Sequence, residues 1–239
     1  MLTRELVALI HGYDYRYVQG PQFTDGRWGT WTKVPVLQEA LKTHEVAVFL
    51  DTDIALHYPH VPLEWLMNHW GVTDKTLIAM ALDVDEPANI NEKGVRSLNT
   101  GLVIAQQSVR TQEMFDSWLK CPQEPDSYYQ GCSNWKNQWA HEQAAFRDYI
   151  LPLYNRPEDV VTIPCDEANG SPEGPGSGPS NCTGTFVRHY WHHKPLVKSA
   201  LIDGIMPYVV SRLHQELHRE PGNIQYAGEK QFDGGWTFQ

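Results

Sequence analysis

The feature that most constrains this chain is an apolar run, Val46-Ala47-Val48-Phe49-Leu50, which stops at Asp51-Thr52-Asp53. A continuous apolar run of this length predicts a central strand that is buried on both faces. Residues two apart on a strand share one face, so Asp51 and Asp53 should lie together. Two carboxylates there repel each other, and a divalent cation such as Mg²⁺ or Mn²⁺ removes that cost. The competing interpretation is a solvated turn in which the acids only cap the strand.

Strand-like apolar runs alternate with helical stretches over most of the 239 residues. This alternation predicts an α/β domain of the Rossmann-type sandwich class, with a mostly parallel central sheet and flanking helices. Ligands of such sheets bind beyond the carboxyl ends of the strands, which is where Asp51 stands. We expect one domain over residues 1–220, with a mobile Gly- and Pro-rich loop at 169–180, followed by a polar tail at 221–239.

The chain is acidic, with a formal net charge of −10, and 41% of its residues are apolar. The apolar fraction argues against disorder over the whole length. The acidic balance, without any basic block, argues against nucleic acid as the main partner. An acidic protein that binds a phosphorylated anion must neutralise it locally, and a bound divalent cation is the simplest means.

Four cysteines form two sets, and each set brackets a loop. No Cys-x-x-Cys spacing occurs, so a zinc site is not expected. Both loops are natural places for a disulfide. The sets are Cys121 with Cys132 and Cys165 with Cys182.

Two N-glycosylation sequons occur in the second of these loops, at Asn169 and Asn181. Together with the cysteine-bracketed loops, they favour the lumen of the secretory pathway over the cytoplasm. The sequence contains neither a signal peptide nor a membrane span. Contact with a membrane is therefore expected only through an anchor that is absent from this chain.

A local positive cluster lies late in the chain. Three histidines, one arginine and one lysine occur within the seven residues from Arg188 to Lys194. A histidine such as His189 can complete a metal site, and a lysine can contact a phosphate as a point charge. The competing interpretation is an ordinary aromatic strand with exposed histidines.

Two further motifs offer polar side chains to a ligand. His141-Glu142-Gln143 lies near the start of a predicted helix, where an acid or amide could face a cleft. Leu98-Asn99-Thr100-Gly101 opens a predicted strand, where Gly101 allows a close backbone approach. The simpler interpretations are a solvated first turn, with Glu142 favoured by the helix dipole, and a plain strand edge.

The order of these motifs resembles that of fold-A (nucleotide-diphospho-sugar) glycosyltransferases. Within that group the chain is most similar to family 34, the Golgi galactosyl-, mannosyl- and xylosyltransferases of fungi and plants. The resemblance covers roughly Leu2 to Lys194. Its matching stretches are His11-Gly12-Tyr13-Asp14-Tyr15, Trp31-Thr32-Lys33-Val34-Pro35-Val36-Leu37, Phe49-Leu50-Asp51-Thr52-Asp53, Leu98-Asn99-Thr100-Gly101-Leu102-Val103-Ile104, Glu142-Gln143-Ala144-Ala145-Phe146 and Phe186-Val187-Arg188-His189-Tyr190.

The resemblance implies retaining transfer of a hexose or pentose from a UDP- or GDP-sugar to a glycan or glycoprotein acceptor. It implies that Mn²⁺, or Mg²⁺, binds Asp51, Asp53 and His189. Glu142 and Gln143 match the segment beneath the anomeric carbon, where a carboxylate or amide stabilises oxocarbenium-like charge. The residues then expected to bind the nucleotide sugar are Asp51, Thr52, Lys33, Asn99, Thr100, Gly101, His192 and Lys194.

The chain departs from the family pattern at three places. The strand that opens the fold and normally contacts the uracil or guanine should precede the first helix, and we expect it to be missing. His141-Glu142 stands where the family has two acids before the glutamine. Trp191-His192-His193 replaces the usual Ala-Gly-Cys.

Two other functions stay open at this point. A degenerate, non-catalytic module that binds a nucleotide sugar or a glycan fits the three departures. A haloacid-dehalogenase-type phosphohydrolase also uses an apolar strand that ends in Asp-x-Asp. Against it, Ala55 stands where that class usually has Thr or Val, and Asp83-Val84-Asp85 is a poor candidate for its later acidic pair.

Overall fold

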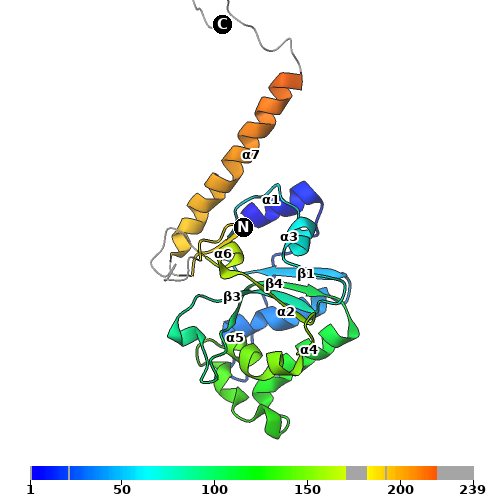
Figure 1. Ribbon diagram of the computed structural model, residues 1–239, viewed down its shortest axis with the longest axis vertical. Helices are drawn as coiled ribbons and strands as arrows, with labels where there is room; N and C mark the ends of the chain where they lie inside the picture. Colours follow the sequence, from blue (N-terminus) through cyan, green and yellow to red (C-terminus); the bar gives the residue numbers. More distant parts are fainter. Residues whose placement is uncertain (1, 21, 171–181, 192, 220–239) are drawn as a thin grey trace, which may run out of the picture.

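The structure is a computed structural model that describes residues 2–20, 22–170, 182–191 and 193–219. A four-stranded sheet with the order β1-β4-β3-β5 lies between helices, and a second sheet pairs β2 with β6 (Figure 1). The strands are β1 Val46–Leu50, β2 Ile54–Leu56, β3 Ile78–Leu82, β4 Leu98–Gln106, β5 Val160–Ile163 and β6 Val187–His189. The helices are α1 Leu2–His11, α2 Lys33–Ala40, α3 Leu63–His69, α4 Val109–Lys120, α5 Glu142–Ala145, α6 Cys165–Ala168 and α7 Val197–Arg219.

The class is mixed α/β, but the expected mostly parallel pairing is not confirmed. Strand β4 runs antiparallel to both of its neighbours, β1 and β3, and only β3 and β5 pair in parallel. The physical reason is the connection between β3 and β4. It returns through residues 83–97 without a long crossover helix, and a return of that kind joins antiparallel strands.

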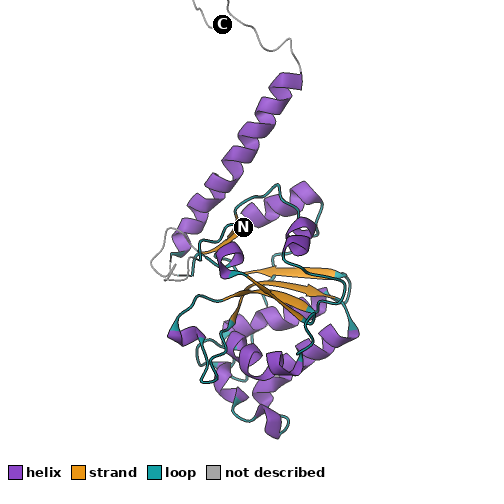
Figure 2. Ribbon diagram, viewed as in Figure 1, coloured by secondary structure: helices purple, strands orange, loops and turns teal. Residues whose placement is uncertain are grey.

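Helices cover both faces of the sheet (Figure 2). Alternate residues of β4 enter opposite cores, because successive strand side chains point to opposite faces. Val103 packs with α2 and α4, whereas Ile104 packs with α1 and α3. The first core is centred on the buried side chains of Trp31, Val34, Met114, Phe115, Trp118 and Phe146. The second is centred on Val7, Leu66, Trp70, Ala79 and Ile163.

Strand β1 lies at one edge of the sheet and not at its centre. Its partner is β4, and within the described ranges no strand pairs with its other edge. The apolar run that predicted a central strand is instead flanked by the two helix layers. A cavity of about 1360 Å³ follows this free edge between α1, α2 and α3, and it reaches Lys33, Asp51 and Thr52.

Two disulfides join the two cysteine sets, Cys121 with Cys132 and Cys165 with Cys182. The first ties the end of α4 to a 3₁₀ turn at Cys132–Lys136, and the second ties α6 to the segment that leads into β6. Disulfides of this kind persist in oxidising compartments, so both are consistent with the secretory pathway.

None of the helices that the structure describes is long and apolar enough to cross a lipid bilayer.

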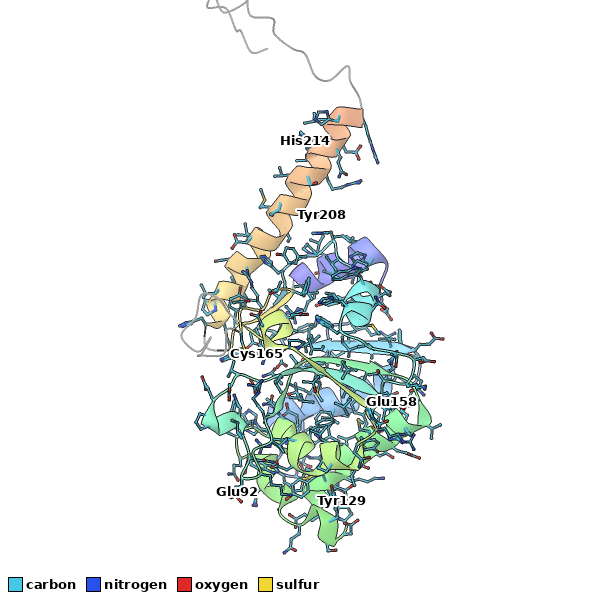
Figure 3. All side chains as sticks on the ribbon, in the orientation of Figure 1. Glu92, Tyr129, Glu158, Cys165, Tyr208 and His214 are labelled. Atoms are coloured by element: carbon cyan, nitrogen blue, oxygen red, sulfur yellow. A yellow bond between two sulfur atoms is a disulfide. The ribbon has the colours of Figure 1, made fainter. Side chains whose placement is uncertain are left out.

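Helix α7 begins against β2 and α1 and then extends away from the rest of the molecule (Figure 1). Tyr208 still reaches the rest of the molecule, since its ring stacks on His60 with centroids 6.3 Å apart, whereas His214 lies farther along the extended part (Figure 3). Gly204 allows the helix to pack closely after β2, because an added Cβ would lie 3.0 Å from the His57 carbonyl oxygen.

Candidate active site

Three potential metal ligands converge where the two sheets meet. Asp51 follows β1, Asp53 precedes β2, and His189 ends β6. The antiparallel pairing of β2 with β6 sets Ile54 opposite His189, and Tyr190 N–H donates to the Asp53 carbonyl at 2.9 Å. As a result, one ligand atom from each of the three side chains lies within 4.8 Å of the others. Two carboxylates and an imidazole form a donor set that suits Mn²⁺ or Mg²⁺.

Asp53 is the most strongly engaged of the three. Its carboxylate lies 3.2 Å from His189 Nε2 and 2.9 Å from Lys194 Nζ. Burial raises the pKa of Asp53, but His189 and Lys194 outweigh burial and hold that pKa well below its usual range. Asp53 is therefore an anionic ligand at neutral pH.

The His189 ring is oriented by a second hydrogen bond. Its Nδ1 lies 2.9 Å from the amide oxygen of Asn169, which can only accept. Nδ1 therefore donates to Asn169, which leaves Nε2, 3.2 Å from Asp53, as the ring nitrogen that would ligate a metal. A histidine that ligates a metal is commonly held in this way by an oxygen on its other nitrogen. The site thus fits a metal ion both in its three potential ligands and in Asn169, the residue that orients one of them.

Gly101 leaves the space that the His189 ring fills. A Cβ on Gly101 would stand 2.4 Å from His189 Cε1, 2.7 Å from Nδ1 and 2.8 Å from Asn99 Oδ1. The Asn99 side chain in turn accepts from Gly101 N–H at 2.8 Å. The motif at 99–101 therefore shapes the group of Asp51, Asp53 and His189, which we call the metal cluster for its potential ligands, because only glycine admits the ring this close to β4.

We expect Gly101→Ala to displace His189 and to weaken Mn²⁺ binding about 10- to 100-fold, the range seen when the groups that orient a ligand are lost. Mn²⁺ titration followed by calorimetry measures this change. Gly29→Ala is the matched control, since nothing lies within 4 Å of its added Cβ. Equal Mn²⁺ affinity in the two variants would contradict the packing argument.

Lys33 links the metal cluster to the start of α5. Its ammonium lies 3.1 Å from Asp51 Oδ2, 3.1 Å from the Thr100 carbonyl and 3.3 Å from Glu142 Oε1. Burial lowers the pKa of Lys33, but the charges of Asp51 and Glu142 outweigh burial and raise it. Lys33 is therefore a buried cation between two carboxylates, and its three N–H donors are already engaged.

The pair Glu142 and Gln143 lies beside the first residues of β4. Thr100 Oγ1–H donates to Glu142 Oε1 at 2.8 Å, and Gln143 Oε1 accepts from Thr100 N–H at 3.1 Å. Gln143 Nε2 donates to Asp83 at 2.7 Å, so both ends of the amide are occupied. Glu142 is 2% exposed, and its Oε2 has no hydrogen-bond partner among the described residues. Of Glu142 and Gln143, only Glu142 thus keeps a side-chain oxygen, the buried Oε2, that accepts no hydrogen bond from the described residues.

Sequence reasoning missed three residues that support this site. Arg4 donates to the carbonyls of Leu50, Asp51 and Thr52 at 3.2, 2.8 and 3.3 Å, so α1 holds the turn that carries Asp51 and Asp53. The sequence could have indicated that Arg4 faces the core, because Arg4 shares one helix face with the apolar Val7 and Ala8.

Asp83 and Asn169 are the other two missed residues. Asp83 accepts from Gln143 and from Asn169, which joins the α5 end of the site to His189. Asn169 is 1% exposed, so the folded protein does not present its sequon. The Gly- and Pro-rich composition placed Asn169 in a mobile loop, and no local pattern could have shown that its amide is buried.

The structure thus gathers most of the predicted site residues into one connected group. Thr52 is at the surface and contributes its carbonyl to Arg4. Lys194 is 68% exposed and is paired with Asp53. His192 lies outside the described residues. The connected group consists of Lys33, Asp51, Asp53, Asn99, Thr100, Gly101, Glu142, Gln143, His189 and Lys194.

The sequence matches no protein-family profile and no curated protein. Among solved structures, the chain is similar to a glycosyltransferase involved in the glycosylation of the major capsid of PBCV-1. The TM-score is 0.57 at 13% sequence identity, over 83% of this chain and 88% of the other. The chain therefore has the fold of a glycosyltransferase, and the fold alone is what a likeness at this identity shows.

Proposed function

We propose that this chain is a metal-dependent retaining glycosyltransferase, most like family 34, that moves a hexose or pentose from a nucleotide-diphosphate sugar to a glycan or glycoprotein acceptor. The observation that carries the proposal is the convergence of Asp51, Asp53 and His189 near Glu142, a buried carboxylate with one oxygen that accepts no hydrogen bond from the described residues. The glycosyltransferase fold supports it. The fold comparison lends no support to the phosphohydrolase alternative.

Each part of the donor has a place in this proposal. Asp51, Asp53 and His189 hold Mn²⁺ or Mg²⁺, which when bound offsets the charge of the donor diphosphate. Lys194, which the structure leaves largely exposed, exchanges Asp53 for a phosphate oxygen. The nucleoside half lies in the cavity beside β1, which reaches Asp51 and Thr52.

The reacting sugar lies between the metal ligands and α5. Asn99, Thr100 and Gly101 border it, and Lys33 fixes the distance between Asp51 and Glu142. In this proposal the Glu142 carboxylate stabilises the positive charge that develops at the anomeric carbon, while Gln143 orients the strand beneath it. The departing diphosphate accepts the proton of the incoming hydroxyl, so the new bond forms on the face that the diphosphate leaves.

The remaining expectations belong to the same proposal. The domain spans residues 1–220, with a separate polar tail, and His192 adds to the phosphate contacts. The two disulfides support an oxidising compartment, and within it we propose the Golgi lumen.

The proposal predicts that Mn²⁺ with UDP or GDP raises the melting temperature. A ligand at 100 times its Kd stabilises the native state by about 2.7 kcal/mol. For a chain of this size that corresponds to a rise of about 5–10 °C, measured by differential scanning fluorimetry. The same nucleotides with EDTA are the control. If no nucleoside diphosphate shifts the melting temperature, the donor site is not where we place it.

A non-catalytic binding module is the second candidate. The ion pair between Lys194 and Asp53 favours it, because an ammonium already occupies a metal ligand. Hydrolysis of UDP- and GDP-sugars separates the two candidates. A non-catalytic module binds the nucleotide sugar without releasing the sugar. A transferase slowly hydrolyses its own donor, and the donor that is hydrolysed identifies the transferred sugar.

A further inference from the structure

Two of the most exposed tryptophans in the described part of the chain meet at one histidine. Trp28 is 58% exposed and Trp139 is 69% exposed, although each indole is a large apolar group. The Trp28 ring stacks on His141, with centroids 5.6 Å apart and planes 6° apart. The Trp139 ring meets the same imidazole edge-on, at 5.8 Å and 77°. The two indoles therefore stand roughly perpendicular to each other around a shared ring, and we call Trp28, Trp139 and His141 the aromatic corner.

Backbone hydrogen bonds hold the aromatic corner in place. Trp28 N–H donates to the Lys136 carbonyl at 2.7 Å, and Trp31 Nε1–H donates to the Trp135 carbonyl at 3.0 Å. These bonds join the segment that carries Trp28 to the 3₁₀ turn that precedes Trp139. The disulfide between Cys121 and Cys132 fixes the start of that turn. The corner is thus built before any ligand arrives, which lowers the entropy cost of binding.

The corner adjoins the proposed reaction centre. His141 is followed directly by Glu142, whose carboxylate contacts Thr100 and Lys33. His141 itself is 8% exposed, and burial lowers its pKa, so the ring is neutral at neutral pH. The charges of Glu142 and Lys33 both act on the His141 ring, so the aromatic corner lies near the carboxylate that we place beside the anomeric carbon.

The chemistry of the corner selects a sugar ring. One face of a pyranose carries C–H groups, which suit the electron-rich face of an indole, and its hydroxyls remain free for polar neighbours. An exposed aromatic cluster beside a reaction centre is typical of a ligand-binding surface and not of core packing. A protein partner would need a far larger area than two indoles provide.

We propose that the aromatic corner is the acceptor site, where a pyranose of the acceptor glycan stacks on Trp28 or Trp139 with its reactive hydroxyl directed toward Glu142. This inference rests on the proposed glycosyltransferase function and names the acceptor half of its site.

The test uses saturation-transfer NMR with the methyl glycosides of galactose, glucose, mannose and xylose as probes, in the presence of UDP or GDP and Mg²⁺, which unlike Mn²⁺ is diamagnetic. We expect at least one glycoside to bind the wild-type chain. Trp28→Ala and Trp139→Ala should each weaken that binding about tenfold, which equals about 1.4 kcal/mol. Trp139→Phe should keep most of it, because the aromatic face is retained.

Trp65→Ala is the matched control. Trp65 is also exposed, at 48%, and it also stacks on a histidine, His69, at 5.1 Å and 8°. It lies on α3, away from Glu142, so its loss should leave glycoside binding unchanged. Equal losses in Trp65→Ala and Trp28→Ala would overturn the proposal.

The two proposals fail in different ways. If the wild-type chain shows the nucleotide-dependent thermal shift but no glycoside binds, the aromatic corner is not an acceptor site and the donor site stands. If glycosides bind and depend on Trp28 and Trp139 while no nucleotide binds, the corner is a sugar site and the transferase function fails. If loss of the two tryptophans weakens only the binding of a deglycosylated protein, the corner recognises protein and the proposal is wrong.

Discussion

Asp53→Ala is expected to lower sugar transfer roughly a thousandfold or more, the equivalent of about 4 kcal/mol in the barrier, because a metal ion on a diphosphate supplies several kcal/mol of charge stabilisation. The same change should abolish the Mn²⁺-dependent part of the nucleotide thermal shift. Transfer or donor hydrolysis measures the first effect, and calorimetric titration with Mn²⁺ measures the second.

Asp53→Asn and Asp203→Ala are the comparisons for this experiment. The amide keeps the size of the side chain and loses its charge, so Asp53→Asn should resemble the alanine variant. Asp203 is exposed on α7 and is not among the potential metal ligands, so its loss should change neither measurement. A wild-type Mn²⁺ affinity in Asp53→Ala would show that the carboxylate is only a partner for Lys194.

Lys33→Met is expected to cost about 3–5 kcal/mol of folding free energy, because it leaves the carboxylates of Asp51 and Glu142 without their buried cation. The melting temperature should fall by roughly 10 °C, and urea denaturation gives the free energy directly. The pKa of Lys33 is raised, so its contribution is fully present below its ordinary value of 10.5 and is lost only as pH rises above its folded-state pKa. The effect should therefore be constant from pH 6 to 9.

Two further variants test whether the loss at Lys33 has this electrostatic cause. The double variant Lys33→Met with Glu142→Gln should recover part of the stability, since one of the two uncompensated charges is gone. Lys42 pairs with Glu39 while 59% exposed, so Lys42→Met should cost less than about 1 kcal/mol. No recovery in the double variant would assign the loss to packing of the lysine stem.

The metal cluster was predictable from the sequence only in part. The apolar run before Asp51 is a local pattern, and it correctly indicates a strand that ends in two carboxylates. The partnership with His189 depends on β2 and β6, which are three residues each and lie far apart in the chain. Strands that short carry almost no periodic signal, so the resemblance and not the spacing supplied the third ligand.

The sheet shows where a local pattern stops being informative. An apolar run indicates that a strand is covered on both faces, but coverage by helices gives an edge strand the same composition as a central one. The run at β1 therefore predicted a strand correctly, but it overestimated the burial and placed the strand wrongly, since β1 is an edge strand in which only Ala47 is buried and Val46 is 36% exposed. The direction of β4 was also out of reach, since direction depends on the route of the connection at 83–97 and not on the residues of the strand.

The free edge of β1 has a consequence for how this protein behaves in concentrated solution. The outward backbone groups of an edge strand are a template for another strand, and such edges are a common route to aggregation. Here the helix layers lie on either side of this edge and narrow the approach to it. Among the described residues, the cavity walls from α1, α2 and α3 therefore flank an edge that would otherwise be open to strand pairing.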